Sequence, residues 1–367
     1  MLKRIQDKQL KSIGEKVLNE ERLDYEDGLA LYHSQDLLSL GVLANYVREK
    51  KNGNIAYYIV NQHINYSNIC KNLCLFCAFG KDSEDPLAYE LSLEDIENKI
   101  RERLRDPISE VHIVGGIHPS LPFSYYVEML KRIKAIRPEV HLQAFTPVEV
   151  AHLAEQAGKT VAETLSILRG AGLGSLPGGG AEVFSSRIRK TLCPKKISSE
   201  GWLSVCKTAH QLGLKTNATM LYGHIETAAE KVDHLLTLRQ AQDETGGFMA
   251  FIPLAFHSKN TDLEGLPETT GMEDLKNIAI ARLMLDNFPH IKSFWIMVGP
   301  KLSQIALGFG ADDIDGTVLE EKITHMAGAQ TAQAQTREEI LHLIREAGRE
   351  PVERDTLYQI RPLRKDG

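Results

Sequence analysis

The feature that most restricts the fold of this chain is an alternation of short β-rich runs with helical patterns. Eight such runs follow one another: Gln62–Asn65, Val111–Val114, His141–Phe145, Gly172–Leu176, Lys215–Leu221, Phe248–Leu254, Ile291–Val298 and Ile305–Phe309. This alternation is typical of a parallel sheet whose strands are joined by crossover helices. It predicts an α/β fold, a (β/α)8 TIM-type barrel, with a partial six-strand barrel as the alternative.

The stretches between these runs carry helical signals. Ile96, Ile100 and Leu104 recur at every fourth position, as on one face of a helix. Thr336 and Glu339 form a capping-box pattern that predicts a further helix start near the end of the chain.

The pattern divides the chain into three parts. We expect a helical N-terminal extension over residues 1–55, the barrel over residues 56–314 and a closing segment over residues 315–367. Together they form one structural unit, since no low-complexity linker separates them.

Composition and charge exclude several functions. Hydrophobic residues make up 43% and charged residues 25%, as in soluble globular proteins. The net charge of −6 comes without clustered Lys and Arg, which argues against nucleic-acid binding. No apolar leader is visible, and apolar runs such as Phe248–Phe256 are too short to span a membrane. We therefore expect a cytoplasmic protein without a membrane partner.

Three of the five cysteines fall within eight residues, as Cys70-Lys-Asn-Leu-Cys74-Leu-Phe-Cys77. This loop follows the first predicted strand, and barrel enzymes place their chemistry at the C-terminal ends of strands. Thiolates are the usual ligands of iron–sulfur clusters, and full ligation takes four. Three ligands would leave one iron of a [4Fe–4S] cluster open to a small molecule.

The cysteines allow two other interpretations, a fourth cysteine ligand and a zinc site. Against the first, Cys193 and Cys206 are better explained as buried small hydrophobic residues than as a fourth ligand. A structural zinc site would normally need four ligands in paired spacing, and His63, although nearby, lies on a strand and faces away from a loop ligand as often as toward it.

With Phe76 just before the third cysteine, the motif resembles that of the radical S-adenosylmethionine (SAM) superfamily. The resemblance implies a barrel of the radical SAM kind, with Cys70, Cys74 and Cys77 as cluster ligands and SAM chelated to the open iron. An electron from the cluster would cleave SAM to methionine and a 5′-deoxyadenosyl radical. It further implies a reducing donor such as flavodoxin or ferredoxin.

The predicted barrel rim offers further contacts for SAM. Gly115 and Gly116 follow the second strand, where glycine lets the main chain approach a ligand closely. Glu182, after three glycines, is placed to accept hydrogen bonds from ribose hydroxyls. The remaining cofactor-binding candidates are Phe76, Arg187, Met220 and Tyr222, and the substrate candidates are His118, His224 and His257.

Longer phrases narrow the resemblance to the aminodeoxyfutalosine synthase family of menaquinone biosynthesis. They are His112–Pro119, Leu176–Glu182, Phe251–His257 and Pro351–Tyr358. This resemblance implies a transferase that adds the 5′-deoxyadenosyl radical to the enol-ether double bond of 3-[(1-carboxyvinyl)oxy]benzoate, a small-molecule substrate. Rearrangement and loss of bicarbonate then give 6-amino-6-deoxyfutalosine.

Two sibling families, dehypoxanthine futalosine cyclase and the radical SAM subunit of deazaflavin synthase, share the cysteine loop and the triple glycine. An iron–sulfur electron carrier would be a different class of protein, but such carriers are usually small and ligate their clusters fully.

Overall fold

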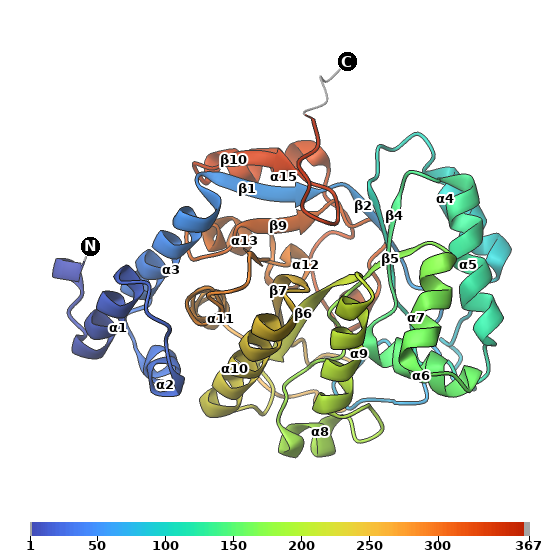
Figure 1. The fold of residues 1–367 in the computed structure, drawn as a ribbon, viewed down its shortest axis with the longest axis horizontal. Coiled ribbons are helices and arrows are strands. Elements are labelled where there is room, and N and C mark those ends of the chain that lie inside the picture. The colour runs from blue at the N-terminus through green and yellow to red at the C-terminus, as the bar shows by residue number, and fades with distance from the viewer. Residues whose placement is uncertain (1, 363–367) are drawn as a thin grey trace.

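The computed structural model, which describes residues 2–362, contains a seven-stranded parallel sheet that forms a partial barrel (Figure 1). The strands follow one another in chain order: β2 (Asn61–Ile64), β3 (Glu110–Ile113), β4 (His141–Ala144), β5 (Leu173–Leu176), β6 (Lys215–Tyr222), β7 (Phe248–Ala255) and β8 (His290–Ile291). The first six lie within one residue of the predicted runs at each end. The α/β barrel class is therefore confirmed.

A second, three-stranded parallel sheet has the order β10-β1-β9, from β1 (Ile55–Ile59), β9 (Asp313–Gly316) and β10 (Glu350–Glu353). The segment that begins with β9 spans the gap between the edges of the larger sheet. Ser293 N–H donates to the Asp313 carbonyl beside β8, and His63 N–H on β2 donates to the Leu319 carbonyl. An irregular segment thus occupies the place of an eighth strand.

The predictions for the last two strands are wrong. The run expected over Ile291–Val298 leaves the sheet after Ile291, and its apolar end forms helix α12 (Trp295–Val298). The run expected over Ile305–Phe309 instead overlaps the end of helix α13 (Pro300–Ala306). Pro300 favours a helix start because its fixed φ suits the first turn. Short apolar runs do not by themselves distinguish a buried helix from a strand.

Helices cover the outside of the barrel and the N-terminal side of the molecule (Figure 1). They are η1 (Leu2–Arg4), α1 (Lys8–Leu18), α2 (Tyr25–His33), α3 (Leu37–Asn52), α4 (Leu93–Glu102), α5 (Phe123–Ile136), α6 (Pro147–Ala157), α7 (Val161–Gly170), α8 (Ser186–Leu192), α9 (Ser199–Gln211), α10 (Ala228–Thr245), α11 (Gly271–Met284), α14 (Ile323–Met326) and α15 (Arg337–Glu346), besides α12 and α13. The capping box predicted at Thr336 is present at the start of α15. The division at residues 55 and 315 stays a prediction. Within residues 2–362, no helix has the length and apolar character needed to cross a bilayer.

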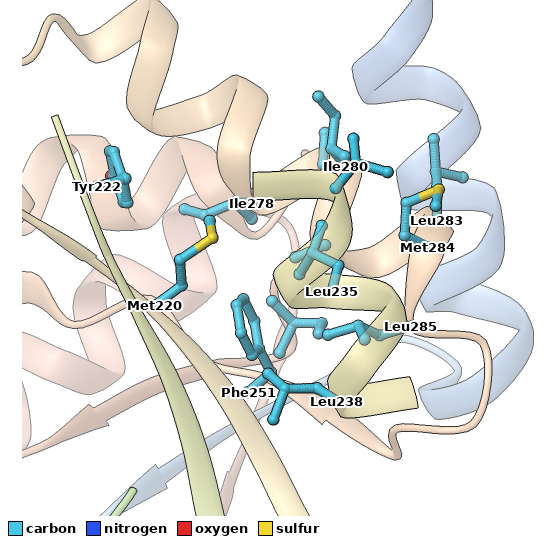
Figure 2. Close-up of a cluster of buried hydrophobic side chains, with 14 of the residues drawn as sticks. Met220, Tyr222, Leu235, Leu238, Phe251, Ile278, Ile280, Leu283, Met284 and Leu285 are labelled. Carbon is cyan, nitrogen blue, oxygen red and sulfur yellow. The ribbon is translucent and has the colours of Figure 1, made fainter. Parts of the chain in front are cut away.

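One apolar core lies between the sheet and helices α10 and α11 (Figure 2). Met220 and Tyr222 on β6 and Phe251 on β7 pack there with Leu235 of α10 and Ile278 of α11. All five side chains are almost fully buried. This core fixes which face of β6 and β7 is turned away from the barrel interior.

Candidate active site

A cavity of about 330 Å³ lies inside the partial barrel, within the size range of small-molecule sites. Its walls come from β2, β3, β4, β6 and β7 and from the loops that follow the strands. Eight residues of the predicted site line it together: Cys70, Cys74, Cys77, Phe76, Gly115, Gly116, Glu182 and His257. The structure therefore gathers the predicted cluster loop and glycine pair around one space.

The cysteine loop follows β2 and folds back on itself. Cys77 N–H donates to the Cys74 carbonyl at 2.9 Å, and Gly80 N–H donates to Cys77 Sγ at 3.3 Å. A β-carbon at Gly80 would lie 3.3 Å from Cys70 Cβ and 3.7 Å from Cys77 Sγ, so the two ends of the loop are close together. All three thiols are free, and burial raises the pKa of Cys77 to about 11.

The arrangement fits a cluster better than a single metal ion. Among residues 2–362, no three His, Cys, Asp or Glu side chains converge closely enough to hold one ion, whereas structural zinc takes four ligands on one ion. A cubane cluster instead places each cysteine on a different iron. Cys70, Cys74 and Cys77 line one cavity, and this matches the requirement for a cluster with an open iron.

Cys193 lies against the cysteine loop, a contact that the sequence did not reveal. Leu75 N–H donates to the Leu192 carbonyl at 2.9 Å and so joins the loop to the end of α8. A hydrogen bond from the Cys193 thiol lowers the pKa of the Cys74 thiol, which favours the thiolate that binds metal. Cys193 is buried and does not line the cavity, and its prediction as a non-ligand stays a prediction.

The glycine pair stands where no larger residue fits. A β-carbon at Gly116 would lie 2.2 Å from the Ile69 carbonyl oxygen, and one at Gly115 would lie 2.5 Å from the Tyr66 ring. Gly116 N–H donates to the Ser67 carbonyl at 2.8 Å. Glycine is required because the backbone of this wall runs directly against the start of the cysteine loop.

Glu182 forms an ion pair with Lys196, and the Lys196 ammonium lies over the Phe76 ring. Lys196 Nζ donates to Glu182 Oε1 at 2.6 Å and lies 5.2 Å from the centre of the Phe76 ring. Burial opposes the charge on Lys196, but the charges of Cys74 and Glu182 outweigh it and raise the lysine pKa. Lys196 lines the cavity, although no sequence motif marks it.

Met220 and Tyr222 do not line the cavity, contrary to their predicted role in the adenosine pocket. Successive side chains of a strand point to opposite faces. On β6, Asn217, Thr219 and Leu221 face the cavity, whereas Met220 and Tyr222 face the core under α10 and α11 (Figure 2). The sequence prediction therefore located the C-terminal end of β6 correctly but assigned Met220 and Tyr222 to the wrong face of the strand.

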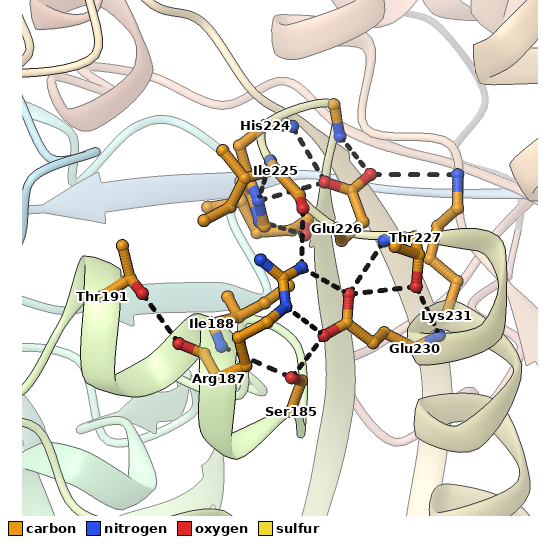
Figure 3. A network of polar contacts seen from close by, with 12 residues as sticks. Ser185, Arg187, Ile188, Thr191, His224, Ile225, Glu226, Thr227, Glu230 and Lys231 are labelled. Carbon is orange, nitrogen blue, oxygen red and sulfur yellow. Dashed lines mark hydrogen bonds and ion pairs between the residues drawn. The ribbon is translucent and has the colours of Figure 1, made fainter.

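Arg187 and His224 also do not line the cavity and belong to a polar network at the start of α8 and α10, in which the Arg187 side chain is exposed and that of His224 is buried (Figure 3). The Arg187 guanidinium donates to both oxygens of Glu230 at 2.9 and 2.7 Å. His224 Nε2 donates to the Leu221 carbonyl at 3.0 Å, and its Nδ1 lies 3.0 Å from Glu226. Burial lowers the pKa of His224. The Arg187 contacts join α8 to α10, whereas the His224 contacts stay within the segment from the end of β6 to the start of α10.

The two remaining histidines differ in position. His118 does not line the cavity. Its Nδ1 accepts from Leu121 N–H at 3.0 Å, and its Nε2 lies 2.9 Å from Glu90. It therefore stabilises the turn after the glycine pair. His257 does line the cavity, where its Nε2 donates to the Met297 carbonyl at 3.0 Å.

Polar side chains that the sequence prediction omitted form the inner part of the cavity. His63 and His112 stack with their ring centres 4.5 Å apart, and burial lowers the pKa of both. Lys292 Nζ donates to Asp315 Oδ1 at 3.1 Å, and Asn217 Oδ1 has no hydrogen-bond partner within residues 2–362. Polar residues at alternate positions of buried strands are the signal that would have marked this surface.

Comparisons with known proteins agree with this site. Residues 64–238 match the family model "Radical SAM superfamily", and residues 245–367 match "CofH/MqnC C-terminal region". The chain is 46% identical to the aminodeoxyfutalosine synthase of Thermus thermophilus, over 97% of this chain and 96% of that protein. It is 44% identical to that of Streptomyces coelicolor, over 95% and 93%.

A third relative carries another name. The chain is 40% identical to the 5-amino-6-(D-ribitylamino)uracil–L-tyrosine 4-hydroxyphenyl transferase of Methanococcoides burtonii, over 91% of this chain and 94% of that protein.

Solved structures support the fold alone. The crystal structure of methylornithine synthase superposes with a TM-score of 0.73 at 20% identity, covering 92% of this chain and 97% of that one. The [FeFe]-hydrogenase maturase HydG gives 0.74 at 18% identity, covering 96% and 77%. The family model and the sequence relatives, by contrast, show that the chain belongs to the radical SAM superfamily, as an enzyme that uses a [4Fe–4S] cluster and SAM.

Proposed function

We propose that this chain is an aminodeoxyfutalosine synthase. It would transfer the 5′-deoxyadenosyl group of SAM to the enol-ether double bond of 3-[(1-carboxyvinyl)oxy]benzoate, with rearrangement and loss of bicarbonate, to give 6-amino-6-deoxyfutalosine for menaquinone biosynthesis. The observation that carries this proposal is the identity of 46% and 44% to two synthases over nearly the whole chain.

The three loop cysteines, Cys70, Cys74 and Cys77, are proposed to hold the cluster. When bound, it would supply the electron that cleaves SAM, received in turn from a flavodoxin or ferredoxin. The Gly115–Gly116 wall would receive the methionine end of SAM through the Gly115 carbonyl, because glycine allows a ligand to approach the main chain closely, whereas the Gly116 carbonyl accepts from the Tyr66 hydroxyl at 3.3 Å. Glu182 would accept hydrogen bonds from the ribose hydroxyls while Lys196 keeps its carboxylate in place at 2.6 Å.

The cavity wall suits a reaction that passes through a carbon radical. At the C-terminal ends of β6 and β7 the wall is apolar and includes Leu221 and Leu254, which are paired in the sheet. Apolar walls exclude water and keep a bound alkene close to its reaction partner. The deeper polar surface, with the Lys292 ammonium and the His63 ring, offers hydrogen-bond donors to the carboxylates of the proposed substrate.

The ribitylaminouracil–tyrosine transferase is a second candidate function, because relatives with that name are 40% identical over a similar length. The two candidates differ in the molecule that receives the radical. They can be separated directly, because the synthase takes the enolpyruvyl benzoate, whereas the name of the transferase specifies L-tyrosine and 5-amino-6-(D-ribitylamino)uracil.

We expect the anaerobically reconstituted enzyme to consume the enolpyruvyl benzoate with SAM and form a product of aminodeoxyfutalosine mass. A parallel incubation would contain L-tyrosine and 5-amino-6-(D-ribitylamino)uracil in place of the benzoate, with products of both read by mass spectrometry. The proposal predicts product in the first mixture alone. Turnover in the second mixture alone would assign the chain to the transferase.

A further inference from the structure

A buried carboxylate outside the cavity holds the glycine wall from behind. Glu149, in the first turn of α6, is only 2% exposed. Its Oε1 accepts from the Tyr66 hydroxyl at 2.8 Å and from Gly115 N–H at 3.1 Å. Its Oε2 accepts from the N–H and the hydroxyl of Thr146, both at 2.7 Å. One carboxylate therefore receives four hydrogen bonds.

These four bonds join the ends of three neighbouring strands. Tyr66 follows β2, Gly115 follows β3 and Thr146 follows β4. Gly115 and Thr146 line the cavity, whereas Glu149 and Tyr66 do not. The Tyr66 ring also lies under Gly115, where a β-carbon would come within 2.5 Å of it. Glu149 thus fixes the spacing of the strand ends that form this wall.

The same contacts fix the direction of the glycine peptides. Gly115 N–H is held by Glu149, and Gly116 N–H is held by the Ser67 carbonyl at 2.8 Å. In a trans peptide the carbonyl points opposite to the N–H of the next residue. The Gly115 carbonyl therefore points away from Ser67, and it belongs to a residue that lines the cavity.

The burial of Glu149 carries an energetic cost. Burial raises its pKa to about 7, and its hydrogen bonds oppose that shift. When an acid has a higher pKa in the folded chain than in the unfolded chain, the folded protein loses stability as the pH rises from the unfolded-state pKa to the folded-state pKa. The ionised form thus opposes folding at neutral pH, although its partners are all donors suited to a carboxylate.

We propose that Glu149 is a positioning residue for SAM binding, which holds the Gly115–Gly116 backbone in the orientation that receives the methionine end of SAM. This inference rests on membership of the radical SAM superfamily and on the proposed role of the glycine pair. It does not depend on the identity of the second substrate, so it can fail while the proposed function stands, and the reverse.

The test compares two capping-box glutamates. Glu149 and Glu163 both accept from the N-cap threonine of their helix, α6 or α7, but only Glu149 also contacts Gly115 and Tyr66. We expect Glu149→Ala to weaken SAM binding about tenfold, because charge-assisted hydrogen bonds that hold the wall are lost. Glu163→Ala should bind SAM as the wild type does. SAM affinity is read from the change in the electron paramagnetic resonance spectrum of the reduced cluster, with iron content and thermal midpoint measured beside it.

Tyr66→Phe keeps the ring under Gly115 and removes only the hydroxyl, so it decides the matter if Glu149→Ala does not fold. We expect it to weaken SAM binding about threefold to tenfold with its iron retained. Wild-type SAM affinity in Tyr66→Phe and in any folded Glu149→Ala would overturn the proposal. An equal loss in Glu163→Ala would also overturn it, since the effect would then come from the helix cap.

Discussion

Replacing Cys70, Cys74 or Cys77 with alanine is expected to remove the iron–sulfur cluster and abolish turnover. Each cysteine binds a different iron in the proposed site, so the loss of any one of them leaves a second iron without a protein ligand. Wild-type protein reconstituted without oxygen should carry about four irons per chain, as a single cubane requires. Iron and sulfide analysis, together with the electron paramagnetic resonance spectrum of the reduced protein, measures the loss.

The other two cysteines provide matched controls. Cys206 is fully buried in the core, and Cys193 donates to Cys74 from outside the cavity. Cys206→Ala and Cys193→Ala should both retain the cluster. Full activity in Cys74→Ala would contradict the ligand assignment, and loss of iron in Cys193→Ala would show that Cys193 is a ligand.

Replacing Gly116 with alanine is expected to weaken SAM binding strongly and so to lower the activity of the enzyme. The new β-carbon would lie 2.2 Å from the Ile69 carbonyl oxygen, and Ile69 directly precedes the first cysteine of the loop. A backbone atom cannot yield as a flexible side chain does, so the glycine wall or the cysteine loop must shift. Overpacking of this kind typically costs about 1–3 kcal/mol of stability. We expect a cost of this size in the wall that receives SAM, which corresponds to a loss of roughly fivefold to 150-fold in SAM affinity.

Gly170 is the control for this substitution. It ends α7, and a β-carbon there would meet nothing within 4 Å. Gly170→Ala should leave SAM binding and activity unchanged, because alanine favours a helix more than glycine does. Wild-type affinity in Gly116→Ala, measured by SAM titration of the reduced cluster, would contradict the close packing of the wall on the loop.

Local sequence patterns predicted the first six strands of the sheet and the cysteine loop. Strands such as β6 and β7 are continuous β-rich runs between turns, and the spacing of the cysteines carries its own chemical meaning. The prediction failed where a short apolar run is compatible with either a strand or a buried helix. The residues after Ile291 are apolar and short, and the helix that begins at Pro300 replaced the expected strand.

The remaining site residues depend on contacts between distant parts of the chain. Lys196 reaches Glu182, and Glu149 reaches Tyr66 across 83 positions. No spacing rule connects such pairs. Met220 shows a different limit, because a shift of one residue exchanges the two faces of a strand and only the packing of α10 and α11 decides between them.

The central claim is that the adenosyl group of SAM becomes part of the product, and SAM labelled in its adenosyl carbons tests it most directly. The enzyme would be incubated anaerobically with the enolpyruvyl benzoate, and labelled species would be separated and quantified by mass. We predict that most of the label appears in a product of aminodeoxyfutalosine mass. Recovery of the label as free 5′-deoxyadenosine, in step with formation of a cyclised product when dehypoxanthine futalosine is supplied, would instead identify hydrogen abstraction and contradict the account.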